Sequence, residues 1–149
     1  MPQLIGIDHI YLTVSDLARS RAFYDVVLHE VLGFEPGEPF SLDGEAHVHY
    51  YNHLFGVVLR VARQAMPHDP YAPGLHHLCL RVEGAEEVER VAVALGARGI
   101  AASPARLYPE YAADYVATFF SDPDGIRLEV TNYRSERRER HARLKDRPG

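Results

Sequence analysis

An internal repeat constrains the fold of this chain more than any other feature of its sequence. The segment HIYLTV at residues 9–14 matches HLCLRV at residues 77–82 in its His, Leu and Val, at an offset of 68. Toward the end of each half, GVVLRV at residues 56–61 matches GIRLEV at residues 125–130 in three positions, at an offset of 69. Two matches at nearly one offset indicate an internal duplication.

The hydrophobic periodicity gives both halves the order strand, helix, strand, strand, strand. In the first half it predicts a strand over 7–14, a helix over 16–32 and strands over 34–38, 46–51 and 55–62. In the second half it predicts a strand over 77–82, a helix over 85–95 and strands over 100–102, 115–120 and 126–131. Ser15 is the expected N-cap of the first helix, and residues 63–74 read as a connecting loop.

Composition and charge narrow the class of protein. The 149 residues are 46% hydrophobic and 25% charged, which is typical of a packed globular domain. No apolar run is long enough for a membrane span, and the lone Cys79 favours a reducing, cytoplasmic setting. Residues 134–149 form a charged tail with seven Lys or Arg and three Asp or Glu, so the preceding residues carry the net negative charge. Because an acidic body repels phosphate, we expect no nucleic-acid binding.

Alternation along the strands brings two histidines and a carboxylate into phase. Successive side chains of a strand point to opposite faces, so His9 faces away from the apolar Ile10 and Leu12. His77 and Glu129 have the same relation to their apolar neighbours. Two imidazoles and one carboxylate are the ligands of a common divalent-metal site, here for Fe, Mn, Zn or Ni. Taken singly, either histidine is more often structural, and the site then holds no metal.

Further polar and aromatic residues are candidates for binding a small-molecule substrate. His47 and His49 alternate on a middle strand, where they line a cavity or an exposed polar face. The tyrosine-rich residues 108–115 form either a wall over the ligand or a packed loop or dimer contact. The full candidate set is Arg60, His47, His49, Arg81, Tyr108, Tyr111 and Tyr115. His76 has the opposite parity to His77, so we expect it on the helix side or in solvent.

Three segments carry a family resemblance. GIDHIYLTVSDLARSRAFY, PGLHHLCLRV and FFSDPDGIRLEV resemble the vicinal oxygen chelate superfamily, which includes glyoxalase I, extradiol dioxygenases, fosfomycin resistance enzymes and bleomycin-binding proteins. The resemblance covers roughly residues 4–133 and implies an α+β fold of paired βαβββ modules, about 4–66 and 75–133, in an open cupped sheet. It also implies metal ligands at His9, His77 and Glu129, and frequent homodimers.

One position departs from the glyoxalase I pattern. That pattern has a fourth ligand on the last strand of the first module, where the offset of 69 puts Arg60. A guanidinium cannot ligate a metal, so Arg60 either binds an anionic substrate group or pairs with Glu129 in place of the metal. The first alternative predicts a metal-dependent lyase, isomerase or dioxygenase other than glyoxalase I. The second predicts a metal-free protein that sequesters a small molecule such as an antibiotic.

Overall fold

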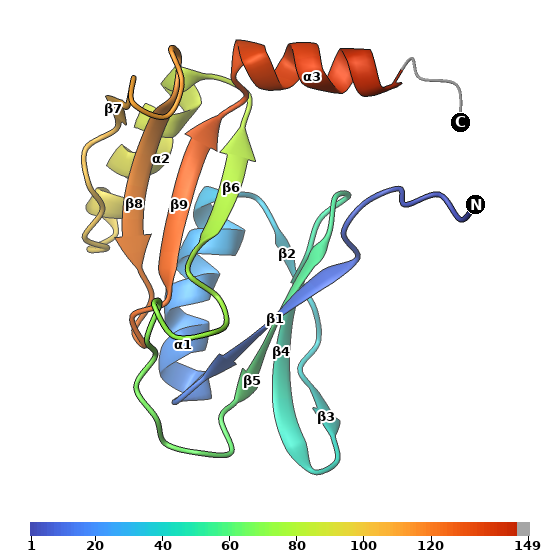
Figure 1. Cartoon of the computed structure of the whole chain (residues 1–149). Coiled ribbons are helices and arrows are strands. Elements are labelled where there is room, and N and C mark those ends of the chain that lie inside the picture. Colours follow the sequence, from blue (N-terminus) through green and yellow to red (C-terminus); the bar gives the residue numbers. More distant parts are fainter. Residues whose placement is uncertain (146–149) are drawn as a thin grey trace. The chain divides into compact units, whose positions relative to one another are not determined.

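The chain folds into two compact units, each built around one βαβββ module (Figure 1). The computed structural model describes residues 1–145. The first unit comprises residues 1–69 with the short segment 122–125, and the second comprises residues 70–121 and those from 126 onward. The α+β class and the paired modules expected from the sequence are thereby confirmed. No helix within residues 1–145 combines the length and apolar character needed to cross a membrane.

The first unit holds one curved sheet with helices on one face. Its elements are β1 (His9–Val14), α1 (Leu17–Tyr24), η1 (Asp25–Val31), β2 (Glu35–Pro36), β3 (Phe40–Leu42), β4 (Glu45–Tyr51) and β5 (Gly56–Val61). The strand order is β1-β5-β4-β2, with β3 paired to β4. β1 and β5 run parallel, which places the first and last strands of the module side by side.

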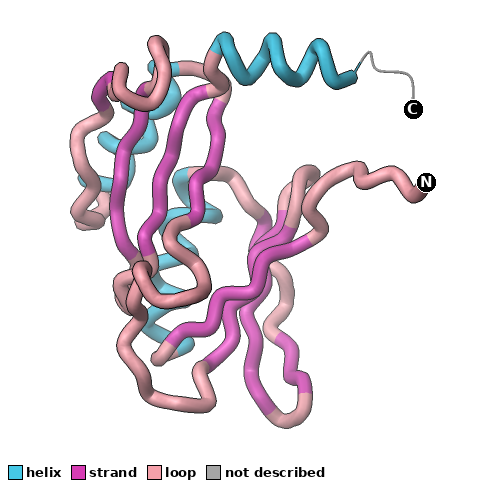
Figure 2. The backbone as a smooth tube through the Cα atoms, viewed as in Figure 1, coloured by secondary structure: helices cyan, strands magenta, loops and turns pink. Residues whose placement is uncertain are grey.

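The second unit repeats this topology (Figure 2). Its elements are β6 (Leu78–Val82), α2 (Ala85–Ala97), β7 (Arg106–Leu107), β8 (Val116–Ser121), β9 (Arg127–Asn132) and α3 (Ser135–Lys145). The order is β6-β9-β8-β7, again with the first and last strands parallel. Most of the expected charged tail is the helix α3, which contains no buried residue; residues 146–149 lie outside the described part of the chain.

α1 and α2 each cover the apolar face of the sheet in their own unit. On β1, Leu12 and Val14 are buried while the alternate residues are exposed, as strand alternation requires. On α2, Val88, Val91 and Leu95 recur at helical spacing and are buried. This helix contacts β6, β8 and β9. The opposite face of each sheet is therefore left for polar and aromatic side chains.

Two local predictions were wrong, the N-cap at Ser15 and the strand over 100–102, and the predicted helix over 16–32 changes type along its length. The helix expected over 16–32 is an α-helix to Tyr24 and then a wider π-helical segment, in which the Leu32 amide bonds the Val27 carbonyl five residues back. Its N-cap is Asp16, whose carboxylate accepts from the Arg19 amide at 2.9 Å. Ser15 instead binds Asp124 through its amide and its hydroxyl.

The strand expected over 100–102 is also absent from the described residues, and the short β7 takes its place at the sheet edge. At Ser103 the side-chain hydroxyl accepts the Phe119 amide at 2.9 Å, where a strand would offer a backbone carbonyl. The side chain therefore competes with the backbone ladder at this point.

The pairing registers correct the sequence alignment of the two halves. Tyr11 pairs with Val58, and Cys79, which is 68 residues after Tyr11, pairs with Glu129. α1 and α2 begin 68 residues apart as well. The counterpart of Glu129 in the first sheet is therefore Val58, and not Arg60 as the offset of 69 suggested.

The turn before β9 belongs to the first unit. The Tyr24 hydroxyl donates to Asp122 at 3.0 Å, and the Ser15 amide donates to Asp124 at 2.9 Å. Tyr24 is 1% exposed and Asp122 is 5% exposed, so this is a buried polar contact. The residues that begin β9 thus follow directly from a turn held by α1.

Candidate functional site

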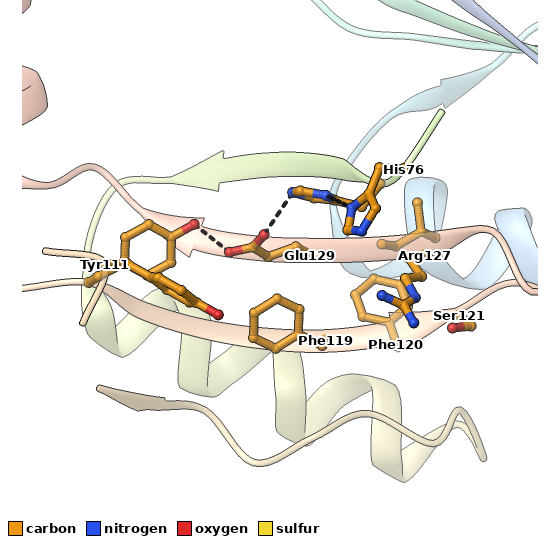
Figure 3. Close-up of a pocket in the computed structure, with 10 residues that line it drawn as sticks. His76, Tyr111, Phe119, Phe120, Ser121, Arg127 and Glu129 are labelled. Carbon is orange, nitrogen blue, oxygen red and sulfur yellow. Dashed lines mark hydrogen bonds and ion pairs between the residues drawn. The ribbon is translucent and has the colours of Figure 1, made fainter. Parts of the chain in front are cut away.

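The polar face of the second sheet is hollowed into a cavity of about 620 Å³ (Figure 3). Its lining residues come from β8, β9, the loop before β6 and the tyrosine-rich loop: His76, His77, Tyr111, Tyr115, Phe119, Phe120, Ser121, Arg127, Leu128 and Glu129. Four of the ten side chains are aromatic rings of Tyr or Phe. The cavity therefore combines a polar centre with an aromatic wall.

Glu129 is the central polar residue of this cavity. Its side chain is 5% exposed, and one carboxylate oxygen lies 3.4 Å from Nε2 of His77. The other oxygen accepts the Tyr115 hydroxyl at 2.5 Å. Burial, followed by this hydrogen bond, raises the pKa of Tyr115 above its ordinary value, so Tyr115 stays a proton donor to Glu129. The carboxylate is thus fixed in place with one oxygen directed to the imidazole.

His76 lies in the same cavity, contrary to the parity argument. Its Nδ1 is 2.7 Å from Nδ1 of His77, so one ring donates to the other. Parity fails here because both histidines precede Leu78, where β6 begins, and loop residues do not alternate. When the Nδ1 of His77 donates a hydrogen bond to His76, its Nε2 lone pair faces Glu129. A lone pair and a carboxylate that face each other are arranged like two ligands of one cation.

Cys79 adjoins the same carboxylate. As a residue it is exposed, yet the protein packed around its thiol and then the Glu129 carboxylate raise the pKa of that thiol to about 12. Without a bound cation, Cys79 is therefore a neutral thiol at neutral pH.

The first unit carries an equivalent cavity of about 560 Å³ on the polar face of its own sheet. His9, His49 and Val58 line it. The Nδ1 of His9 lies 2.6 Å from an Asp8 carboxylate oxygen, which leaves Nε2 as its free lone pair. His49 fits closely beside Gly56, where an added Cβ would lie 3.2 Å from its Nε2.

The remaining predicted residues lie elsewhere. His47 is 2% exposed, is stacked on Phe40 and is bonded through Nδ1 to the Glu45 carbonyl, so it belongs to the packing of the first unit. Arg60 pairs with the carboxylate of Glu45 on the adjacent strand. This observed partner is neither of the two that the sequence left open, a substrate anion and Glu129.

Two more of these residues lie outside the lining of the second cavity. The Arg81 guanidinium lies 4.3 Å from the Tyr133 ring centroid. Tyr108 is buried behind the wall, stacked against the exposed Tyr111.

Six of the ten lining residues were missing from the predicted set, and two of them lie beside Glu129. Arg127 is two residues before Glu129 on β9, and Phe119 pairs directly with Glu129 across the ladder. The signal for Arg127 was present, since it has the parity of Glu129. The sequence carried no signal for Phe119, because its neighbour Phe120 is equally apolar. Both rings line the cavity, and the register places Phe119 opposite Glu129.

The three expected metal ligands are divided between the units. His9 belongs to the first unit, and His77 and Glu129 belong to the second. Residues 1–145 include no group of three His, Cys, Asp or Glu side chains placed to hold a metal ion. His77 and Glu129 lie 3.4 Å apart in the second unit, and His9 contacts Asp8 in the first.

The family model of the Glyoxalase/Bleomycin resistance protein/Dioxygenase superfamily matches residues 6–130. The chain belongs to this superfamily. No curated protein sequence matches the chain.

Solved structures of the superfamily are similar over most of their length. A glyoxylase/bleomycin resistance protein/dioxygenase domain from a Frankia species is 27% identical with a TM-score of 0.73, over 89% of this chain and 100% of that one. A glyoxalase family protein from Enterococcus faecalis is 27% identical with a TM-score of 0.67, over 85% and 97%. A mutant of the fosfomycin resistance protein FosX from Listeria monocytogenes, complexed with Mn(II) and 1S,2S-dihydroxypropylphosphonic acid, shares the fold at 18% identity and a TM-score of 0.68, over 93% and 99%.

Proposed function

We propose that this protein is a divalent-metal-dependent enzyme that acts on a small oxygenated molecule. In this proposal His9, His77 and Glu129 hold the metal, and the substrate approaches from the cavity side. The observation that carries it is the pair formed by His77 and the buried Glu129 carboxylate, 3.4 Å apart in a cavity large enough for a small molecule.

The donor chemistry of these residues fits a divalent cation. An imidazole lone pair and a carboxylate directed at each other repel unless a proton or a cation lies between them. The Asp8 contact at His9 and the Tyr115 hydroxyl at Glu129 are the kind of supporting bonds that orient metal ligands. The Mn(II) bound by the FosX structure is consistent with an ion of this type.

The protein side of the chemistry follows from the cavity. A bound divalent ion supplies Lewis acidity to substrate oxygens. The Tyr115 hydroxyl donates a hydrogen bond to Glu129, and the rings of Phe119 and Tyr111 exclude water from one side of the cavity. The His76–His77 pair offers an imidazole for proton transfer. Val58, and not a carboxylate, stands where glyoxalase I-type sites have a fourth ligand, so we place the protein outside glyoxalase I proper.

One observation favours the metal-free alternative, a protein that binds or sequesters a small molecule. With a proton on Nε2, His77 satisfies Glu129 directly, and Tyr115 satisfies the other oxygen. The cavity is then a complete binding site without any ion.

Metal binding by the purified chain separates the two functions. We expect about one divalent ion per chain by equilibrium dialysis and elemental analysis. His9→Ala, His77→Ala or Glu129→Gln should each weaken binding strongly, because three ligands share the ion. His141→Ala, which removes an imidazole from α3, is the matched control and should bind like the natural protein. Full binding in all three ligand variants would overturn the assignment.

The expected symmetric homodimer and cytoplasmic location remain part of this proposal. Tyr111, Leu107 and Val93 are large apolar or aromatic residues that are 61%, 47% and 72% exposed in the isolated chain. A second copy of the chain is a suitable cover for such surface.

A further inference from the structure

We propose that the cavity of the second unit selects a small planar carboxylate, which Arg127 binds through its anionic group and Phe119 through its flat body. This inference rests on the proposed function, which assigns His77 and Glu129 to the opposite end of the same molecule. It adds the chemical class of the ligand.

The positive charge of the Arg127 guanidinium is available to bind an anionic ligand. This guanidinium donates to the Tyr71 hydroxyl at 3.2 Å and lies 5.2 Å from that ring's centroid. Neither contact neutralises it, and none of the carboxylates in residues 1–145 forms an ion pair with it. By contrast, Arg60 and Arg138 are each paired with a glutamate. A planar guanidinium with free donors binds a carboxylate bidentately.

The nearby Glu129 carboxylate has partners other than Arg127. His77 and Tyr115 already contact its two oxygens. Arg127 is the one guanidinium among the cavity's lining residues. An incoming anion therefore finds its favourable partner at Arg127.

Strand geometry sets the length of the ligand. Arg127 and Glu129 are two residues apart on β9, so strand alternation puts them on the same face, and both line the pocket in Figure 3. Two residues of strand span about 7 Å, which is the scale of one aromatic ring with its substituents. The ligand is thus short, with its anionic group at one end and its oxygen atoms near Glu129 at the other.

A flat aromatic surface lies beside the Glu129 end of the cavity. Phe119 is directly opposite Glu129 on the neighbouring strand. Tyr108 contacts the Phe119 ring edge-on at 5.4 Å between centroids, and Tyr111 stacks on Tyr108. These contacts fix the orientation of the Phe119 ring. Aromatic rings held in this way favour planar partners over puckered ones.

The test uses three probes of similar size: benzoate, its uncharged analogue benzamide, and the non-planar cyclohexanecarboxylate. Binding to the full chain is followed by NMR chemical-shift titration in the presence of a chelator. We expect benzoate to bind at least tenfold more tightly than benzamide. Arg127→Gln should abolish that preference, whereas Arg81→Gln, which removes a guanidinium outside the cavity lining, should retain it. Phe119→Leu should lower the preference for benzoate over cyclohexanecarboxylate.

Several results would overturn the inference: equal binding of benzoate and benzamide, no binding of either, or a charge preference that persists in Arg127→Gln. The dispersion of each variant's NMR spectrum shows whether it has folded. Metal binding measured on the same samples separates the two proposals. A protein that selects benzoate through Arg127 but takes up no metal keeps this inference and loses the proposed function. A protein that binds metal without that selectivity does the reverse.

Discussion

Val58 holds the position in the first sheet that Glu129 holds in the second. Val58 is paired with Tyr11 on the first strand of its module, and Glu129 is paired with Cys79, which is 68 residues after Tyr11. One position carries an apolar side chain and the other a carboxylate bonded to Tyr115. The duplication has therefore kept the backbone and made the chemistry of the two sheets unequal.

Replacing Val58 restores a carboxylate at this position. Val58 is 5% exposed, so Val58→Glu should lower the free energy of unfolding by roughly 1–3 kcal/mol in a chelator. In the proposed metal site the new carboxylate would be a fourth ligand, so divalent metal should then recover much of this loss. Thermal unfolding with and without Mn²⁺ measures both effects. Arg60→Glu, at the position that the sequence alignment had favoured, is the control and should show no added recovery with metal.

Removing the Tyr115 hydroxyl tests the support of Glu129. Tyr115→Phe keeps the ring and deletes the bond to the carboxylate. We expect metal affinity to fall by about 10-fold to 100-fold, the range typical of such supporting contacts, with the fold intact. Isothermal titration with Mn²⁺ gives the affinity and circular dichroism the fold. Tyr111→Phe, at the same wall, should leave the affinity unchanged; an equal loss in both variants would contradict the role of the Tyr115 hydroxyl.

Two buried tyrosines make the first unit sensitive to alkali. Burial, followed by the charge of Asp122, raises the pKa of Tyr24 above its ordinary value, and burial with the bond to Asp25 raises that of Tyr50. In the unfolded chain both phenols lose their protons near pH 10, while in the folded chain they keep them. Stability is thus fully present below about pH 10 and lost above it, by up to about 1.4 kcal/mol per pH unit for each phenol.

Urea unfolding at several pH values between 9 and 11 measures this slope. Tyr24→Phe should reduce the slope and also weaken the hold on Asp122. The exposed Tyr51→Phe is the matched control. A slope that stays the same in Tyr24→Phe would show that other groups cause the alkaline loss.

The N-cap of α1 gives a local test. Asp16→Ala should lower the free energy of unfolding by about 1 kcal/mol, because the Arg19 amide loses its acceptor. Asp16→Asn keeps an acceptor oxygen and should cost much less. Urea unfolding distinguishes them, and equal losses would mean that the charge of Asp16 matters more than its hydrogen bond.

The last prediction concerns the tail and the dimer. In α3 no residue is buried, and its main contacts are Arg138 with Glu83 and Tyr133. Deleting residues 136–149 should therefore change the free energy of unfolding by about 1 kcal/mol or less. Light scattering should give twice the 16.8 kDa chain mass for the full protein, and a dimer for the shortened one. A stable monomer in either case would contradict the prediction.

The sequence by itself determined the class of fold and most of the candidate ligands. The strand alternation at His9–Val14 separates an apolar face from a polar one, and the repeat carries that pattern into the second half. Local periodicity also located α2 to within two residues at its end. These features depend only on residues close together in the sequence. A buried face needs an apolar residue at every second position of a strand, or at every third or fourth position of a helix.

Only the tertiary structure decided the register and the partners. A shift of two residues keeps every side chain on its face, so alternation cannot distinguish Val58 from Arg60 as the counterpart of Glu129. Long side chains end where a partner is available: Arg60 at Glu45 on the paired strand, and Arg81 over the Tyr133 ring. Which residues pair across strands depends on the order and register in which the strands join the sheet. That is a property of the folded sheet and not of any one segment.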